Sequence, residues 1–163
     1  MSVEEIFRRI VGALEATGIP YMLTGSFASS HHGTPRATQD IDLVIAPTED
    51  QLRTLLRQLP DTEYYVSEES ALGALTRRGQ FNVLDLKTGW KVDLILRKDR
   101  DFSRTELARR ETAELRGVRL QIATAEDVLQ AKMEWAKIGG SERQLEDAAG
   151  ILSARGEELD RSY

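Results

Sequence analysis

The chain has 163 residues, a length that suits one domain built around a single hydrophobic core. It is 40% hydrophobic and 30% charged, as an ordinary globular protein is, and contains no apolar run of the roughly 18 residues that a membrane span needs. The net charge of −5 argues against a general nucleic-acid-binding surface, and the lack of cysteine excludes disulfides and thiolate metal sites. Because the N-terminus does not resemble a signal peptide either, we expect a cytoplasmic protein.

The first third of the chain predicts alternating helices and strands. Ser2 and Glu5 form a capping-box pattern before apolar residues at helical spacing, and Gly18 and Pro20 end this first helix. A buried strand, one or two helical turns, a second strand and a helix closed by a proline then follow at residues 21–24, 27–32, 41–46 and 52–60.

The remainder predicts two hairpins and a pair of helices. QFNVLDLKTGWKVDLIL should turn at Lys87-Thr88-Gly89, and AELRGVRLQI at Arg116-Gly117. Two helix starts, Thr124 with Asp127 and Ser141 with Gln144, flank a Gly-Gly link. The predicted fold class is therefore α/β (α+β), a mixed twisted sheet flanked by helices. We expect residues 1–122 to form the core and residues 123–163 a C-terminal helical hairpin packed on it.

Three acidic residues fall inside predicted apolar strands. Asp40 and Asp42 flank Ile41 and project to the same face of their strand, and Asp93 lies in the later strand KVDLIL. A carboxylate without a partner is expensive to bury, so convergence of the three would favour a bound Mg²⁺ or Mn²⁺ ion. The alternative is that the three acids have a purely structural role.

In that alternative reading, each acid is satisfied by a nearby group and binds no metal. The pair in the first strand could cap a neighbouring helix or bind Arg36, and Asp93 could bind Lys91 or Lys87.

Gly25-Ser26 stands between the first strand and the predicted helical turn. Glycine lets a backbone approach a ligand closely, and the amides at a helix start attract anions such as phosphate. Alone the dipeptide is a common turn. Beside a divalent-metal site it indicates phosphoryl or nucleotidyl transfer.

Together these stretches resemble the nucleotidyltransferase superfamily (the DNA polymerase β-like fold). Its signature is an apolar strand, Gly-Gly or Gly-Ser, a spacer, and then acid-apolar-acid-apolar. Here thirteen residues separate Gly25-Ser26 from Asp40-Ile41-Asp42-Leu43. RATQDID and the tail AKMEWAKIGGSERQLEDAAGIL look like those of minimal and abortive-infection toxin-type bacterial members. The resemblance covers nearly the whole chain.

The resemblance implies that an NTP gives its NMP to a hydroxyl of RNA, protein or a small molecule. Asp40, Asp42 and Asp93 would be catalytic and bind Mg²⁺ or Mn²⁺, with Asp85 a weaker candidate for the third acid. Gly25 and Ser26 would contact the β- and γ-phosphates. A partner subunit, or the antitoxin of a toxin–antitoxin pair, is a further expectation.

Lys132 and Arg143 are candidate phosphate ligands on the predicted C-terminal helices. Lys132 lies within an apolar stripe, so it must either extend to solvent or find a partner, which would be Asp147 of the next helix or a triphosphate. Arg143 precedes Asp147 by four residues, the less favourable order for a helical ion pair, and could point at phosphate. The His31-His32 pair is predicted to be a surface turn rather than a metal site.

Two other functions are compatible with the sequence. One is an inactive nucleotide- or RNA-binding module of the same fold, and the other is a regulatory subunit of a complex. Retention of all three acids favours the enzyme, because an inactive site gains nothing from buried charge.

Overall fold

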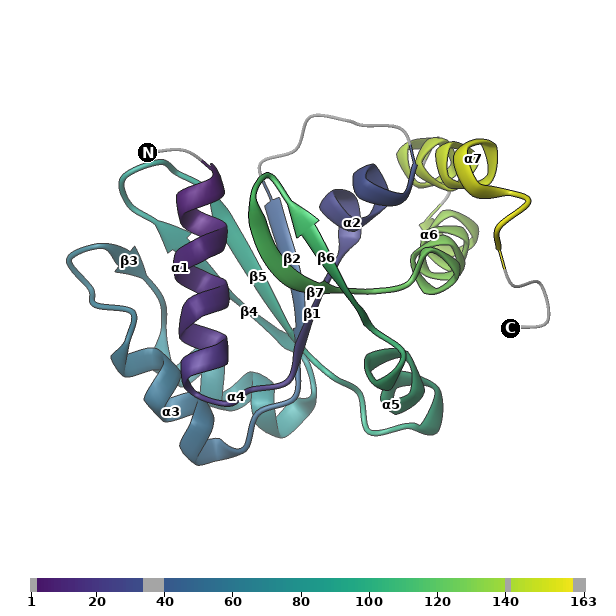
Figure 1. Cartoon of the computed structure of the whole chain (residues 1–163). Coiled ribbons are helices and arrows are strands. Elements are labelled where there is room, and N and C mark those ends of the chain that lie inside the picture. Colours follow the sequence, from purple (N-terminus) through teal and green to yellow (C-terminus); the bar gives the residue numbers. More distant parts are fainter. Residues whose placement is uncertain (1–2, 34–39, 140–141, 160–163) are drawn as a thin grey trace.

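A computed structural model of the chain describes residues 3–33, 40–139 and 142–159 (Figure 1). Its described strands form one seven-stranded mixed sheet in the order β3-β4-β5-β2-β1-β7-β6. The β2–β5 and β1–β7 pairs are parallel and the other pairs are antiparallel. The strands are β1 (Tyr21–Thr24), β2 (Asp40–Ile45), β3 (Tyr64–Tyr65), β4 (Gln80–Asp85), β5 (Lys91–Leu96), β6 (Glu111–Leu115) and β7 (Val118–Ile122).

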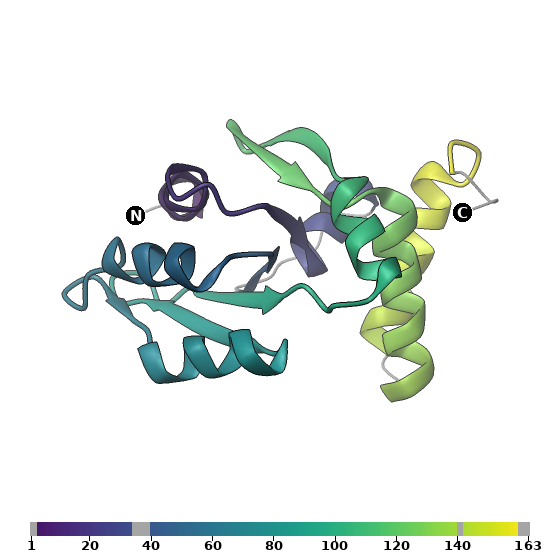
Figure 2. The ribbon, with the colours of Figure 1, turned by 90° about the horizontal axis from the view of Figure 1, so that it is seen from below.

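Helices surround this sheet: α1 (Val3–Ala16), α2 (Gly25–His32), α3 (Glu49–Arg57), α4 (Glu68–Arg77), α5 (Asp101–Ala108), α6 (Ala125–Gly139) and α7 (Glu142–Arg155). Figures 1 and 2 place α3 and α4 at one end of the molecule and α5, α6 and α7 at the other. None of the helices in the described part of the chain has the length and apolarity to cross a membrane.

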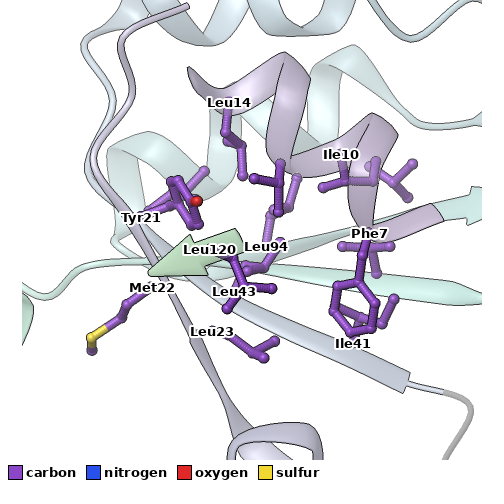
Figure 3. Close-up of a cluster of buried hydrophobic side chains, with 14 of the residues drawn as sticks. Phe7, Ile10, Leu14, Tyr21, Met22, Leu23, Ile41, Leu43, Leu94 and Leu120 are labelled. Atoms are coloured by element: carbon purple, nitrogen blue, oxygen red, sulfur yellow. The ribbon is translucent and has the colours of Figure 1, made fainter. Parts of the chain in front are cut away.

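The hydrophobic core lies between α1 and one face of the sheet. Phe7, Ile10 and Leu14 project from α1 toward Leu43 of β2 and Leu94 of β5 (Figure 3). These side chains are almost fully buried because apolar residues recur at helical spacing in α1 and at alternate positions in the strands. The opposite face of the same two strands carries Asp42 and Asp93 together with the apolar Val44 and Ile95.

The C-terminal helices pack against each other and against α2. A Cβ atom on Gly33, just after α2, would lie only 2.8 Å from the backbone of Gly150 and Ile151 in α7, so this contact is backbone to backbone. Arg155 Nε also donates a 2.9 Å hydrogen bond to the carbonyl of His32. The two C-terminal helices predicted from the sequence thus pack on α2. The division into a 1–122 core and a 123–163 hairpin stays a prediction.

Most predicted elements are present. Both hairpins form, with Gly89 and Gly117 at positive φ in their turns, and Thr124 Oγ1 accepts a hydrogen bond from the amide of Asp127 at the start of α6. The predicted caps at Ser2 and Ser141 lie outside the described residues. Three described elements were not predicted from the sequence: β3, α4 and α5.

The prediction for His32 was wrong. Its side chain is buried in α2 and its Nε2 donates a 2.7 Å hydrogen bond to the carbonyl of Ala123. Burial lowers the pKa of His32 to about 4, so the ring is neutral at physiological pH. His32 therefore ties α2 to the segment before α6.

Candidate active site

The two acid-bearing strands, β2 and β5, are adjacent and parallel. Their register sets Asp42 opposite Asp93 and Asp40 opposite Lys91, so all four side chains share the face of the sheet that α1 does not cover. We call this the carboxylate face. Thr24 of β1 pairs with Asp42 from the other side and continues the same row.

Asp42 and Asp93 form a close pair of like charges. Their carboxyl groups lie within hydrogen-bonding reach of each other. Burial, reinforced by the Asp93 carboxylate and by Asp40, raises the pKa of Asp42 to about 6, while Lys132 acts in the opposite direction. The Asp93 side chain is only 13% exposed, and its buried Oδ1 has no hydrogen-bond partner among the described residues.

Lys91 is the cation beside these acids on the sheet itself. Its Nζ lies 3.8 Å from Asp93 Oδ1 and 3.9 Å from Asp40 Oδ1. The Lys91 side chain is 43% exposed and both distances are close to 4 Å, so these contacts are loose and contribute little to stability. Lys91 therefore offsets part of the negative charge without satisfying the buried Asp93 oxygen.

The backbone at the start of α2 lies directly against Asp42. Gly25 has φ +70°, and a Cβ atom there would lie 2.1 Å from Asp42 Oδ2. Only glycine fits this position. Thr24 is the N-cap residue but makes no side-chain capping hydrogen bond, so its hydroxyl does not occupy the amides of the first turn. The helix start and the carboxylate pair thus share one surface.

A pocket of about 240 Å³ lies where α2, the carboxylate face and α6 meet. We call it the α2 pocket. Its lining includes Thr24, Gly25, Ser26, Asp42, Gln80, Ile95, Lys132 and Gln144.

Lys132 reaches this pocket while bound to Asp147. Its Nζ lies 2.9 Å from Asp147 Oδ2, and both side chains are more than nine-tenths buried. The structural partner expected for Lys132 is therefore present. A role toward phosphate stays a prediction, since the same lysine lines the pocket. The side chain of Arg143 lies outside the described part of the structure, as do Arg36 and Thr38.

Solved structures provide the comparison with known proteins, since no family model and no curated protein sequence matches the chain. The lincosamide antibiotic adenylyltransferase LnuA, bound to lincomycin, superposes with a TM-score of 0.65 at 12% identity, over 94% of this chain and 98% of its own. The complex of ANT(2″)-Ia with adenylyl-2″-tobramycin gives 0.63 at 15% identity, over 96% and 92%. An antigenic nucleotidyltransferase-like protein from Paracoccidioides brasiliensis gives 0.62 at 16% identity, over 96% and 76%.

The chain has the nucleotidyltransferase fold. The resemblance seen in Gly25-Ser26 and in the acid-apolar-acid strand is thus confirmed for the fold. In this chain, Gly25, the first residue of the Gly-Ser pair, packs directly against Asp42, the second acid of the signature.

The acids of this nucleotidyltransferase fold have the donor chemistry of a magnesium or manganese site. Hard carboxylate oxygens are what these ions prefer, and a cation would both relieve the Asp42–Asp93 repulsion and satisfy Asp93 Oδ1. Within residues 3–33, 40–139 and 142–159, no three His, Cys, Asp or Glu side chains are arranged as a complete metal cage. A third ligand to such an ion would have to come from Asp40, turned toward the pair, or from an oxygen of a bound phosphate.

Asp85 was wrong as a candidate for the third acid. It is 1% exposed and lies on the α1 side of the sheet, where Arg9 Nη2 donates a 3.1 Å hydrogen bond to its Oδ1. Its other oxygen accepts a hydrogen bond from the amide of Thr88 in the hairpin turn. Asp85 therefore holds the β4–β5 turn against α1.

Sequence reasoning missed three polar residues that line the α2 pocket: Thr24, Gln80 and Gln144. Gln144 was assigned only to a helix cap, yet its Oε1 is buried without a hydrogen-bond partner among the described residues. No local pattern could have found these residues, because each comes from a different part of the chain.

Proposed function

We propose that this protein is a nucleotidyltransferase that moves NMP from an NTP to a hydroxyl of a small molecule. One observation carries the proposal: Asp42, which forms a like-charged pair with Asp93, packs against the glycine that starts α2 and lines the same pocket as that glycine. Buried carboxylates without a compensating cation are costly. Metal–triphosphate chemistry, however, requires carboxylates that hold the metal directly beside a backbone site that holds phosphate.

In this proposal, Asp40, Asp42 and Asp93 bind Mg²⁺ or Mn²⁺. Such an ion, when bound, neutralises triphosphate charge and acidifies the acceptor hydroxyl. Gly25 and Ser26 hold the β- and γ-phosphates at the amides of α2. Lys132 adds positive charge from α6.

The reaction is an in-line displacement at the α-phosphorus. The acceptor oxygen forms a new bond to phosphorus, the bond to the bridging oxygen of the β-phosphate breaks, and pyrophosphate leaves. The hydroxyl proton passes to the Asp93 carboxylate. The chain's own contribution is to align the reactants and to hold the leaving charge at the start of α2.

A small-molecule acceptor is supported by what the similar structures hold. LnuA was solved with lincomycin and ANT(2″)-Ia with adenylyl-2″-tobramycin. These proteins are about as long as this chain, so a comparable acceptor needs no additional large domain.

The test is a labelling experiment with each of the four α-³²P-labelled NTPs, Mg²⁺ or Mn²⁺, and separate bacterial fractions of small metabolites, RNA and protein. We expect label in the metabolite fraction, lost in Asp42→Asn and Asp93→Asn but kept in Asp61→Asn, which removes an exposed carboxylate elsewhere. Label in RNA or protein would instead favour the toxin hypothesis. Metal-dependent NTP binding without any transfer would favour the inactive binding module.

A further inference from the structure

The carboxylate face continues past Asp93 toward the far edge of the sheet. Asn82 of β4 lies opposite Asp93, and Leu84 lies between Lys91 of β5 and Tyr65 of β3. Since alternate residues of paired strands share a face, these side chains form one surface with the acids.

A recess of about 450 Å³ lies on this surface beside α4. We call it the β4 recess. The lining residues with polar or aromatic chemistry include Tyr65, Ser67, Ser70, Arg77, Asn82 and Lys91.

The β4 recess is suited to an anion next to a flat ring. Arg77 and Lys91 carry positive charge, and no described Asp or Glu lines it. Tyr65 is 68% exposed although it lies on the same face as the acids, so its ring is open to a ligand. One small molecule can contact both features, because Arg77, Lys91 and Tyr65 line the same recess.

Its position relative to the α2 pocket matches the demands of an in-line reaction. The α2 pocket extends from Thr24 of β1 to Gln80 of β4, and the β4 recess continues from the same Gln80 toward Tyr65 at the β3 edge, away from the start of α2. If the leaving phosphates lie at α2, the attacking hydroxyl must come from the opposite side of the α-phosphorus.

A third recess, of about 570 Å³, lies between the sheet, α5 and α6 and includes Glu106, Asp127 and Glu134. We call it the α5 recess. It shares four lining residues with the α2 pocket, so a single molecule can extend through both: Thr24, Gln80, Ile95 and Ala131. The continuous space formed by the α2 pocket and the α5 recess suits the nucleoside of the bound NTP better than it suits a separate acceptor molecule.

We infer that the β4 recess is the acceptor site and that the acceptor carries a phosphate or carboxylate group beside a flat ring. The inference rests on the proposed function and names its substrate class. Arg77 binds the anionic group, Tyr65 stacks on the ring, and the hydroxyl reaches Asp93 past Asn82.

Two matched probes test this charge preference. Phenyl phosphate and benzylamine share a ring and differ in the sign of their charge. Each is titrated into ¹⁵N-labelled protein, with the Asn82 side-chain amide reporting on the β4 recess and the Gly25 backbone amide reporting on the α2 pocket.

We expect phenyl phosphate, and not benzylamine, to shift the Asn82 signal. Arg77→Ala should weaken phenyl phosphate binding about tenfold because it removes a charge-assisted contact. Tyr65→Ala should weaken it several-fold, and it removes no core contact because the side chain is exposed. Arg57→Ala, which removes an exposed arginine at the end of α3, should leave binding unchanged.

Other outcomes overturn the inference. Preferential benzylamine binding that is lost in Glu106→Gln would assign the acceptor to the α5 recess. If phenyl phosphate shifts the Gly25 signal but not the Asn82 signal, it binds only at the nucleotide phosphate site. If it binds at neither, the β4 recess is not the acceptor site.

Titration of the same samples with Mg²⁺ and each NTP tests the proposed function separately. NTP shifts at Gly25 without phenyl phosphate shifts at Asn82 would overturn the acceptor site alone. Phenyl phosphate at Asn82 without any NTP binding would overturn the proposed function and the acceptor role that rests on it.

Discussion

Replacing Gly25 with alanine should separate two effects that the structure combines at the start of α2. Gly25 has φ +70°, a conformation that disfavours any side chain, and its missing Cβ would also overlap Asp42. Its Cβ would lie 2.1 Å from Asp42 Oδ2, 2.7 Å from Cγ and 2.8 Å from Cβ. The overlap is therefore with the whole Asp42 side chain, not with a flexible tip.

Gly89 supplies a matched control for the backbone effect. It has φ +76°, but no atom lies within 4 Å of its missing Cβ. Gly89→Ala should therefore destabilise the fold by about 1–2 kcal/mol, the cost of a left-handed alanine. Gly25→Ala should lose that amount and a further 1–3 kcal/mol or so, the usual effect of forcing extra atoms into a packed site.

Urea unfolding of the two variants measures this difference, since a change in midpoint at constant m-value reports stability. Gly25→Ala should also lose NTP binding because Asp42 must move, whereas Gly89→Ala should retain it. Equal destabilisation of the two variants, within about 0.5 kcal/mol, would refute the steric reasoning.

Three further predictions concern the charges of the site. The folded-state pKa of Asp42 is raised from 3.8 to about 6. The protonated Asp42 carboxyl therefore stabilises the fold below pH 4, and this stabilisation is lost as pH rises through 6. Without metal at pH 8, Asp42→Asn should therefore melt at a higher temperature than wild type, by an amount equivalent to about 1–2 kcal/mol after screening. At pH 4 the two proteins should melt at the same temperature. Lys132→Ala should lower the free energy of unfolding by about 2–4 kcal/mol, because Asp147 loses a buried cation, and should also weaken NTP binding. Asp147→Asn should lower stability but leave NTP affinity nearly unchanged. If wild type, Lys132→Ala and Asp147→Asn all bind NTP with equal affinity, Lys132 is not part of the phosphate site. Lys91→Gln should tighten Mn²⁺ binding about threefold in calorimetry, since an exposed competing cation is worth less than about 1 kcal/mol; weaker binding would contradict that reasoning.

The sequence was sufficient for elements whose signal is local. The alternation in DIDLVI predicts both the buried side of β2 and the acids on its other side, and glycines at the two tight turns predict the hairpins. The apolar spacing of α1 is equally clear. These features depend on residues within a few positions of each other, so the printed sequence contains the whole argument.

Elements with weak local patterns were missed. The helix α4 buries Ala71 and Ala74, which present little apolar surface and give no clear stripe. The strand β3 has two residues and exists through its pairing with β4. His32 looked like a surface residue because its hydrogen-bond partner, the carbonyl of Ala123, is distant in the chain.

The acids, Gly25-Ser26 and Lys132 could be named from the sequence, but their arrangement could not. The parallel register of β2 and β5 sets Asp42 against Asp93, and the packing of α6 and α7 on α2 brings Lys132 to the pocket and binds it to Asp147. Residue types and local periodicity determined which groups are available for chemistry. Only the tertiary structure decided which of them meet, because pairing between distant strands and helices depends on how the whole core packs, and no short stretch encodes that.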